Sequence, residues 1–295
     1  MRIVRTVAAL REALRPARRE ERSIGLVPTM GALHEGHLSL VRAARADNDV
    51  VVVSIFVNPS QFEEAADLDA YPRDQERDAA LLAREGADLV FTPAVDEVYP
   101  PGFATTVHVA AITESLEGAH RGVAHFDAVA TVVTKLLNMA GPDAAYFGQK
   151  DAQQALVVRR LVADLDLPVR IAVCPTIREP DGLALSSRNV RLRGEERDSA
   201  LALRDGLRAA EAALAAGERD ARELRAAAVA AMRRRGVEPE YLEIVGAEDL
   251  APVASVDGAT LLAVAARVGA TRLIDNTLLR PNGAAPSSPT QGRTP

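Results

Sequence analysis

The sequence predicts an α/β fold, a doubly wound parallel sheet followed by a smaller α+β domain. Through the first two-thirds of the chain, short β-branched runs alternate with longer segments whose apolar residues recur three and four positions apart. That alternation is typical of parallel strands joined by crossover helices. After residue 189 the pattern changes to two Ala- and Arg-rich helices followed by strands. Because 295 residues suffice for about two domains, we place the domains at 1–178 and 179–280.

The elements follow in order from these patterns. An Arg-rich helix that we expect to be exposed lies within residues 1–22. Predicted strands of the first domain are 24–27, 50–57, 89–92, 105–109, 144–147 and 169–174. Predicted helices between them are 36–46, 74–85, 126–140 and 152–164. The second domain is predicted to contain helices 195–216 and 220–235 and strands 241–245, 261–268 and 271–279. The Pro-, Ser- and Gly-containing tail, 281–295, is predicted to be disordered.

Composition excludes several classes of protein. A net charge of −6 and an aromatic content of 3% argue against a nucleic-acid partner, which needs a basic face or a base-stacking platform. No apolar segment approaches the roughly 18 residues that cross a bilayer, and the N-terminus lacks the pattern of a secretory signal. The lone cysteine, Cys174, rules out an internal disulfide. We therefore expect a cytoplasmic protein with no membrane partner.

The first motif, PTMGALHEGH, lies between a predicted strand and a predicted helix. His34 and His37 are three positions apart at the helix start, so their imidazoles share a face beside backbone N–H groups that attract anions. Gly36 allows a ligand to approach the backbone closely. A zinc-binding HExxH motif would place the histidines four apart. The alternative interpretation is that the two histidines only cap the helix.

The second motif, FGQKD, again follows a predicted strand and precedes a helix. Lys135 and Lys150 are the only lysines among 35 basic residues, which suggests that a compact ammonium group suits this position better than a guanidinium. Gln154 lies one helical turn beyond Lys150 and would project to the same side. A solvated amide is the alternative interpretation of Gln154.

The third motif, DGLALSSRN, follows the strand predicted at 169–174. Ser186, Ser187 and Arg188 offer several hydrogen-bond donors to phosphate oxygens, although an ordinary exposed turn has the same composition. All three motifs lie just past the carboxyl end of a predicted parallel strand, where open α/β sheets bind ligands. They therefore indicate a shared site for a polyphosphate, and a nucleotide fits that description.

Together these motifs resemble the pantothenate synthetase family, the pantoate–β-alanine ligases of the nucleotidylyltransferase superfamily. The likeness extends to about Leu279. It includes PTMGALHEGH, IFVNPSQF, LDAYPR, FGQKD with Gln153 and Gln154, DGLALSSRN and TRLIDN. The resemblance implies a Rossmann-like first domain, a C-terminal domain that acts as a lid, and a homodimer.

The resemblance also implies a two-step reaction. The carboxylate of pantoate attacks the α-phosphate of Mg²⁺-bound ATP, pyrophosphate leaves, and β-alanine then displaces AMP from pantoyl adenylate. Such a displacement is catalysed mainly by positioning and by electrostatic stabilisation. The residues expected to do this work are His34, His37, Lys150 and Arg188. The resemblance puts His37 in the position of the catalytic acid, and a hydrogen-bonding or cationic role would serve equally well.

Binding residues carried over from the family fall into four groups. The residues expected to line ATP are Met30, Gly31, Ala32, Leu33, His34, Glu35, Gly36, His37, Gly148, Gln149, Lys150, Asp151, Ile177, Leu185, Ser186, Ser187 and Arg188. Those expected to bind pantoate are Gln61 and Gln154, with Asn58 and Tyr71 as further substrate-binding candidates. The alternative interpretation of Asn58 and Tyr71 is a packed or turn residue. More distant pocket candidates are Glu117, Arg121 and His125. Magnesium is expected on ATP oxygens and water, with no dedicated protein cage and with Asp78 as a speculative contact.

Two departures from the family pattern are visible. The usual Arg-Pro-Gly-His-Phe run is replaced by the longer segment at 121–126, and FGQKD stands in place of the commoner FGEKD. Two rival functions remain, an adenylyltransferase with a phosphate-bearing acceptor and a catalytically silent adenine-nucleotide sensor. The first is disfavoured by the neutral amides expected to bind pantoate, and the second predicts binding without turnover.

Overall fold

The computed structural model describes residues 1–62 and 68–281 and divides the chain into two compact units. Unit 1 contains Met1–Gln149 and Gln153–Pro175. Unit 2 contains Lys150–Ala152 and the chain from Thr176 onward. Of the tail predicted to be disordered, 281–295, all but Pro281 lies outside the described residues.

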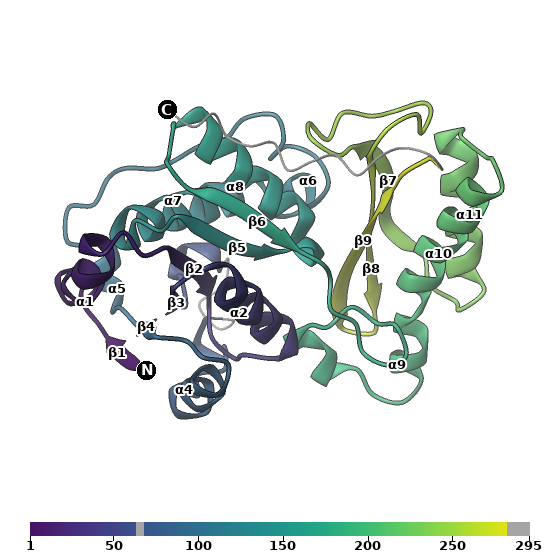
Figure 1. The fold of residues 1–295 in the computed structure, drawn as a ribbon. Coiled ribbons are helices and arrows are strands. Elements are labelled where there is room, and N and C mark those ends of the chain that lie inside the picture. Colours follow the sequence, from purple (N-terminus) through teal and green to yellow (C-terminus); the bar gives the residue numbers. More distant parts are fainter. Residues whose placement is uncertain (63–67, 282–295) are drawn as a thin grey trace. The chain divides into compact units, whose positions relative to one another are not determined.

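Unit 1 is built on a six-stranded sheet in the order β1–β4–β3–β2–β5–β6 (Figure 1). The strands are β1 (Arg2–Val4), β2 (Ile24–Thr29), β3 (Val50–Ile55), β4 (Leu89–Phe91), β5 (Ala144–Gly148) and β6 (Arg170–Cys174). Every pairing is parallel. All six residues of β3 are buried, as expected of a central strand covered on both faces, and this explains its unbroken apolar run.

The connections make the sheet doubly wound. Figure 1 shows α7 and α8 on one face of the sheet and α2 and α4 on the other. The helices of unit 1 are α1 (Val7–Arg19), α2 (Glu35–Asp47), α4 (Gln75–Arg84), α5 (Val95–Val98), α6 (Glu117–Arg121), α7 (Val123–Ala140) and α8 (Ala152–Asp164), with the 3-10 turn η1 (Pro59–Gln61). Most of the 3-10 turn η2 (Gln149–Asp151) and the first residue of α8 belong to the Lys150–Ala152 segment of unit 2. Because α2 and α8 leave neighbouring strands toward opposite faces, the topological switch point lies between β2 and β5. The predicted α/β, Rossmann-like class is confirmed.

The strand predicted at 105–109 is wrong. This segment is extended but pairs with no described strand, and Val107 N–H donates to the Thr131 hydroxyl at 2.9 Å. The strand that pairs with β4 at the end of the sheet is β1, which sequence patterning does not predict because Arg2–Val4 is short and mostly exposed. A β-branched run therefore did not become a strand, because strand formation depends on the tertiary context as well as on local composition.

The N-terminal helix is present, but it is not simply exposed. Leu10, Leu14 and Ala17 of α1 are buried, which makes one face of the helix part of the core. The Arg18 guanidinium donates to the Ala140 carbonyl at the end of α7. Among the described residues, no helix is both long enough and apolar enough to cross a membrane.

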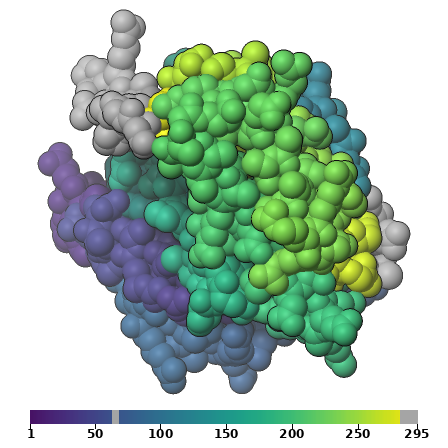
Figure 2. Space-filling view, turned by 90° about the vertical axis from the view of Figure 1, so that its right-hand side faces the viewer, coloured from purple at the N-terminus to yellow at the C-terminus, as the bar shows by residue number. Residues whose placement is uncertain are grey.

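Unit 2 consists of a three-stranded antiparallel sheet covered by helices. The strands are β7 (Pro239–Gly246), β8 (Thr260–Val268) and β9 (Thr271–Leu279), with β8 in the centre. The helices are α9 (Glu195–Ala200), α10 (Ala202–Ala215) and α11 (Ala221–Arg233), after the 3-10 turn η3 (Ser187–Arg191). In Figure 2 the residues of α10 and α11, drawn in green, form the surface on this side of unit 2. The single helix predicted at 195–216 is thus two helices, which meet at Leu201.

Candidate active site

The two histidines of the first motif stabilise the start of α2. His34 is the N-cap, and its Nδ1 accepts a hydrogen bond from Gly36 N–H at 3.2 Å. The His37 Nδ1 accepts from His34 N–H at 3.4 Å, and the ring centroids are 4.1 Å apart. Since both Nδ1 atoms accept, the neutral rings carry their protons on Nε2. Capping and anion binding are therefore compatible, because the cap orients two N–H donors at a helix N-terminus.

A buried carboxylate holds the loop before these histidines. Asp78 of α4 is 1% exposed, and its Oδ1 accepts from Leu33 N–H at 2.9 Å. Gly31 has a φ of +82°, and a Cβ there would stand 3.1 Å from Asp78 Oδ2. The loop therefore needs a glycine for both its backbone angle and its close approach to Asp78. The sequence alone indicated Asp78 only as a speculative magnesium contact and did not reveal this anchoring role.

A hydrogen-bond chain after β3 fixes the orientation of Gln61. Asn58 is 1% exposed, and its Oδ1 accepts from the Tyr99 hydroxyl at 3.0 Å and from the Ser60 hydroxyl at 3.1 Å. Its Nδ2 donates to Gln61 Oε1 at 3.2 Å. With Oε1 so engaged, the Nε2–H groups are the donors of the Gln61 side chain. Tyr99 was missed from the sequence, because only the fold brings it to Asn58.

The two glutamines after FGQKD have different environments. Gln153 is 5% exposed; its Nε2 donates to the Ile112 and Ser115 carbonyls, both at 2.8 Å, and its Oε1 accepts from Glu117 N–H at 2.9 Å. Gln153 therefore anchors the 112–117 loop of unit 1. Gln154 is half-buried on α8, and its role in binding pantoate remains a prediction.

The remaining pocket candidates of unit 1 also have defined positions. Arg121 Nε donates to Glu117 Oε2 at 3.0 Å along α6. The altered 121–126 segment forms the junction between α6 and α7, where Gly122 has a φ of +78°. The His125 and Tyr71 rings lie edge-on to Phe126 and Phe62, respectively.

Within unit 1, the sheet brings several of the predicted segments to one edge. β2 pairs with both β3 and β5. The segments that follow these three strands therefore leave the same edge of the sheet. These segments contain Met30 to His37, Asn58 with Gln61, and Gly148 with Gln149. This is the edge at which the switch point lies.

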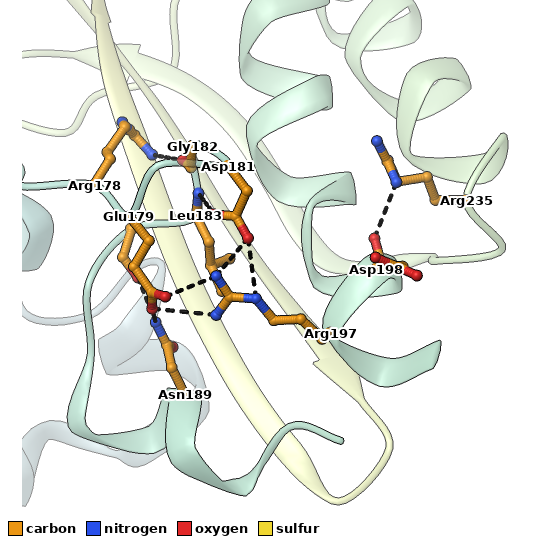
Figure 3. A network of polar contacts seen from close by, with 10 residues as sticks. Arg178, Glu179, Asp181, Gly182, Leu183, Asn189, Arg197, Asp198 and Arg235 are labelled. Carbon is orange, nitrogen blue, oxygen red and sulfur yellow. Dashed lines mark hydrogen bonds and ion pairs between the residues drawn. The ribbon is translucent and has the colours of Figure 1, made fainter. Parts of the chain in front are cut away.

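Unit 2 holds the other predicted residues. The Lys150 carbonyl accepts from Asn276 Nδ2 on β9 at 2.9 Å, and Lys150 Nζ lies 3.7 Å from Asp151 Oδ1. Ser186 is the N-cap of η3, and its hydroxyl accepts from Arg188 N–H at 3.2 Å. Ser187 and Arg188 are exposed, whereas Ile177 and Leu185 are half-buried and joined by a backbone hydrogen bond of 2.9 Å. Figure 3 shows the polar network beside this turn.

In the described part of the chain, no group of three or more His, Cys, Asp or Glu residues could hold a metal ion. The donor set of unit 1 does include the Asp78 carboxylate, whose Oδ1 is already bonded to Leu33 N–H. Burial raises the pKa of the Cys174 thiol, so it favours the neutral form. Burial likewise raises the pKa of Tyr99, and its hydroxyl therefore acts as a donor to Asn58.

The comparisons with known proteins agree over nearly the whole chain. The family model described as pantoate-beta-alanine ligase matches residues 2–278. The chain belongs to the pantoate–β-alanine ligase family. Pantothenate synthetase from Thermotoga neapolitana is 53% identical over 280 residues, which are 95% of this chain and 100% of that protein. Members of the family are enzymes, and this chain is a ligase.

Two solved structures of the family show the same fold. Pantothenate synthetase from Thermus thermophilus is 48% identical, with a TM-score of 0.88 over 94% of this chain and 99% of that one. The ligase from Francisella tularensis, complexed with beta-gamma ATP and beta-alanine, is 34% identical, with a TM-score of 0.76 over 94% and 97% of the two chains. The family expected from the motifs is therefore confirmed.

Proposed function

We propose that this protein condenses pantoate with β-alanine, using ATP, and releases pantothenate, AMP and pyrophosphate. Family membership supports the ligation, and the ATP- and β-alanine-containing Francisella tularensis relative supports these two substrates. The observation that carries the proposal is the pair of capped imidazoles at the switch point. Both imidazoles lie at the N-terminus of α2, a position that favours an anionic ligand such as a polyphosphate.

In the first step, a pantoate carboxylate oxygen forms a bond to the α-phosphorus and the bond to the β-phosphate oxygen breaks. Negative charge grows on the departing pyrophosphate, and His34, His37, Lys150 and Arg188 stabilise it. Because His37 Nδ1 accepts from His34 N–H, Nε2 is the ring nitrogen that can donate a hydrogen bond to the phosphates. Gln61 donates from Nε2 to oxygens of pantoate, and Gln154, Asn58 and Tyr71 complete this proposed substrate site.

In the second step, the amine of β-alanine attacks the acyl carbon of pantoyl adenylate. The acyl–phosphate bond breaks, AMP leaves, and the attacking nitrogen loses a proton. Mg²⁺ supplies charge neutralisation on the phosphates, and we propose that ATP oxygens and water hold most of its coordination sphere. Oδ2 of Asp78, a residue of α4, remains a candidate contact for Mg²⁺. Homodimerisation and a cytoplasmic location stay predictions.

A pyrophosphate-exchange assay tests the proposal. With ATP and Mg²⁺ present, label should pass between pyrophosphate and ATP only when pantoate is added. Addition of β-alanine should then release AMP and form the amide. Formation of ADP would exclude the adenylate route, and nucleotide binding without exchange would support the sensor alternative. Lys150→Ala should slow exchange while leaving the melting temperature nearly unchanged, and an equal loss of stability would indicate a structural role.

A further inference from the structure

The Ser-Ser-Arg turn of unit 2 directly follows the second limb of a small hairpin. Arg178 pairs with Ala184 as an antiparallel bridge, and Glu179 N–H donates to the Leu183 carbonyl at 2.8 Å. The hairpin turns at Gly182, which has a φ of +99°. The chain then enters η3 at Ser187, one short 3-10 turn. Because such turns have poor hydrogen-bond geometry, side-chain contacts decide how firmly they are held.

One carboxylate links that turn to the following helix. Glu179 Oε1 accepts from Asn189 Nδ2 at 2.6 Å, and Glu179 Oε2 accepts from Arg197 Nη2 at 2.8 Å (Figure 3). Asn189 belongs to η3 and also donates to the Ala184 carbonyl at 3.1 Å. Arg197 belongs to α9. The Glu179 carboxylate therefore holds the 186–188 turn through the buried Asn189, while Ser187 and Arg188 face solvent.

Arg197 contacts two carboxylates of the hairpin, one at the end of its first limb and one in its turn. Its guanidinium bonds to Glu179 and also to Asp181, with Nε at 3.1 Å from Asp181 Oδ2. The side chains of Arg197 and Glu179 are 27% and 25% exposed. A planar guanidinium can make such parallel bonds to two carboxylates, whereas a lysine ammonium lacks the fork. Part of the contact is shielded from water, so it is stronger than an exposed ion pair.

Charge balance gives Arg197 a second effect. Two carboxylates, Glu179 and Asp181, lie in the hairpin that precedes Arg188, which is proposed to meet a triphosphate. Uncompensated carboxylates there would repel an anionic ligand. Arg197 neutralises part of that charge, and Arg178 is engaged separately with the buried Asp275 through bonds of 2.7 and 3.0 Å.

We propose that Arg197 and Glu179 are positioning residues for the ATP step, holding the 186–188 turn in the conformation that meets the phosphates. This inference rests on the proposed function. Neither residue is expected to touch substrate. Their contribution is preorganisation: the turn is already ordered before ATP arrives, so less conformational entropy is lost on binding.

The test compares Arg197→Gln, Arg197→Lys and Glu179→Gln with the intact chain in the pyrophosphate-exchange assay. Loss of the charge-assisted bonds should raise the KM for ATP roughly tenfold in Arg197→Gln and change the KM for pantoate by less than about twofold. Arg197→Lys should recover part of the effect, because it keeps the charge but not the fork. Since the two residues act through one contact, the double variant should lose little more than Arg197→Gln alone.

Arg235→Gln is the matched control. Arg235 also holds α9, by donating to the Asp198 carbonyl at 3.1 Å (Figure 3), and it pairs with Asp205 away from the hairpin. The Arg235→Gln variant should lower the melting temperature about as much as Arg197→Gln does, without raising the KM for ATP. Equal KM changes in the two variants, or additive losses in the double variant, would overturn the inference.

The proposed function can fail separately from this inference. If the intact chain gives no pantoate-dependent exchange, the proposed function is wrong. If the intact chain exchanges label and Arg188→Ala raises the KM for ATP while Arg197→Gln and Glu179→Gln do not, only the positioning role is wrong. Should Arg197→Gln fail to fold, Arg197→Lys and Glu179→Gln decide the question by the same split between the two KM values.

Discussion

Gln61 illustrates how a neighbouring hydrogen bond fixes the orientation of a neutral amide side chain. An isolated amide can present either its oxygen or its nitrogen, but the bond from Asn58 Nδ2 engages the oxygen of Gln61. N–H donors suit the carboxylate and hydroxyl oxygens of pantoate, as the proposed role of Gln61 requires. Gln61 could be selected from a family motif, whereas this donor orientation depends on contacts that no sequence spacing shows.

We expect Gln61→Ala to raise the KM for pantoate roughly tenfold, because a neutral hydrogen bond contributes about 1 kcal/mol and its lost partner leaves a substrate oxygen unsatisfied. The KM for ATP should stay within about twofold. Steady-state kinetics in each substrate measure both constants. Gln75→Ala, an exposed glutamine of α4, is the control. A matching loss of ATP affinity would contradict the assignment of Gln61.

Tyr99→Phe tests the hydrogen bonds from Tyr99 to Asn58 and from Asn58 to Gln61. The variant keeps the ring that packs near Phe56 and Phe103 but removes the hydroxyl that donates to Asn58 Oδ1. Because the Ser60 bonds remain, the KM for pantoate should rise only about threefold. In the double variant with Gln61→Ala, Tyr99→Phe should raise the KM for pantoate hardly further, as expected of residues that act through one another. Additive losses in the double variant would show that Tyr99 acts independently.

At the scale of the elements, the three motifs and most helices could be predicted because each has a strong local signal. The turn before α2 has its glycine and histidines, and α10 and α11 have clear apolar periodicity. The 105–109 segment also has a local signal, yet it pairs with no described strand, because strand formation depends on an available partner. Conversely, β1 has a weak signal and forms because β4 offers it an edge.

Helix α4 supplies another contact that periodicity alone does not show. Its buried positions include Asp78 and Leu82, four residues apart on one face. Periodicity identifies that face, but an acidic residue on it was interpreted as a metal contact and not as an acceptor for Leu33 N–H. A buried carboxylate beside a glycine-rich turn is the signal that would have revealed the anchor.

Asp78→Ala should therefore loosen the histidine loop. Loss of the buried acceptor should lower the free energy of unfolding by about 2 kcal/mol, measured by urea denaturation. Asp78→Asn keeps an oxygen for Leu33 N–H and should lose less. If Asp78 also contacts magnesium, Asp78→Asn will shift the Mg²⁺ concentration needed for exchange. Equal destabilisation by the two variants would contradict the anchoring role.

At the scale of the whole molecule, the family and the fold class could be predicted, because long motifs occur in order along most of the chain. The two rival functions share the nucleotide-binding motif, so local sequence alone left them open. The comparisons favour the ligase because they span both units and not only the nucleotide-binding segments.

Low pH should lower the free energy of unfolding through protonation of Glu179 in unit 2. The Arg197 hydrogen bonds are the main cause that lowers the pKa of this carboxyl below its ordinary value of 4.5. Stabilisation from a lowered pKa is fully present above that ordinary value and is lost as the pH falls through the folded-state pKa. The difference in unfolding free energy between the intact chain and Glu179→Gln should thus shrink below about pH 4.5.

Urea denaturation at a series of pH values measures this difference. Asp181 contributes in the same direction: burial raises its pKa, but the Leu183 N–H and Arg197 outweigh burial and lower it. Glu248→Gln, which changes an exposed carboxylate of the same unit, is the control. A difference for Glu179→Gln that stays constant through acid would show that the ion pair contributes nothing to stability.

The three-residue excursion of Lys150–Ala152 into unit 2 has a practical consequence for anyone dividing the molecule. A shortened protein ending at Pro175 would retain every strand of the parallel sheet, yet Asn276 would be missing and the Lys150 carbonyl would lose its donor. Such a fragment would contain Lys150 but would lack the hydrogen bond from Asn276 that holds the Lys150 carbonyl. Mixing separately expressed halves is thus a poor way to assign its chemistry, and substitutions in the intact chain are the sounder route.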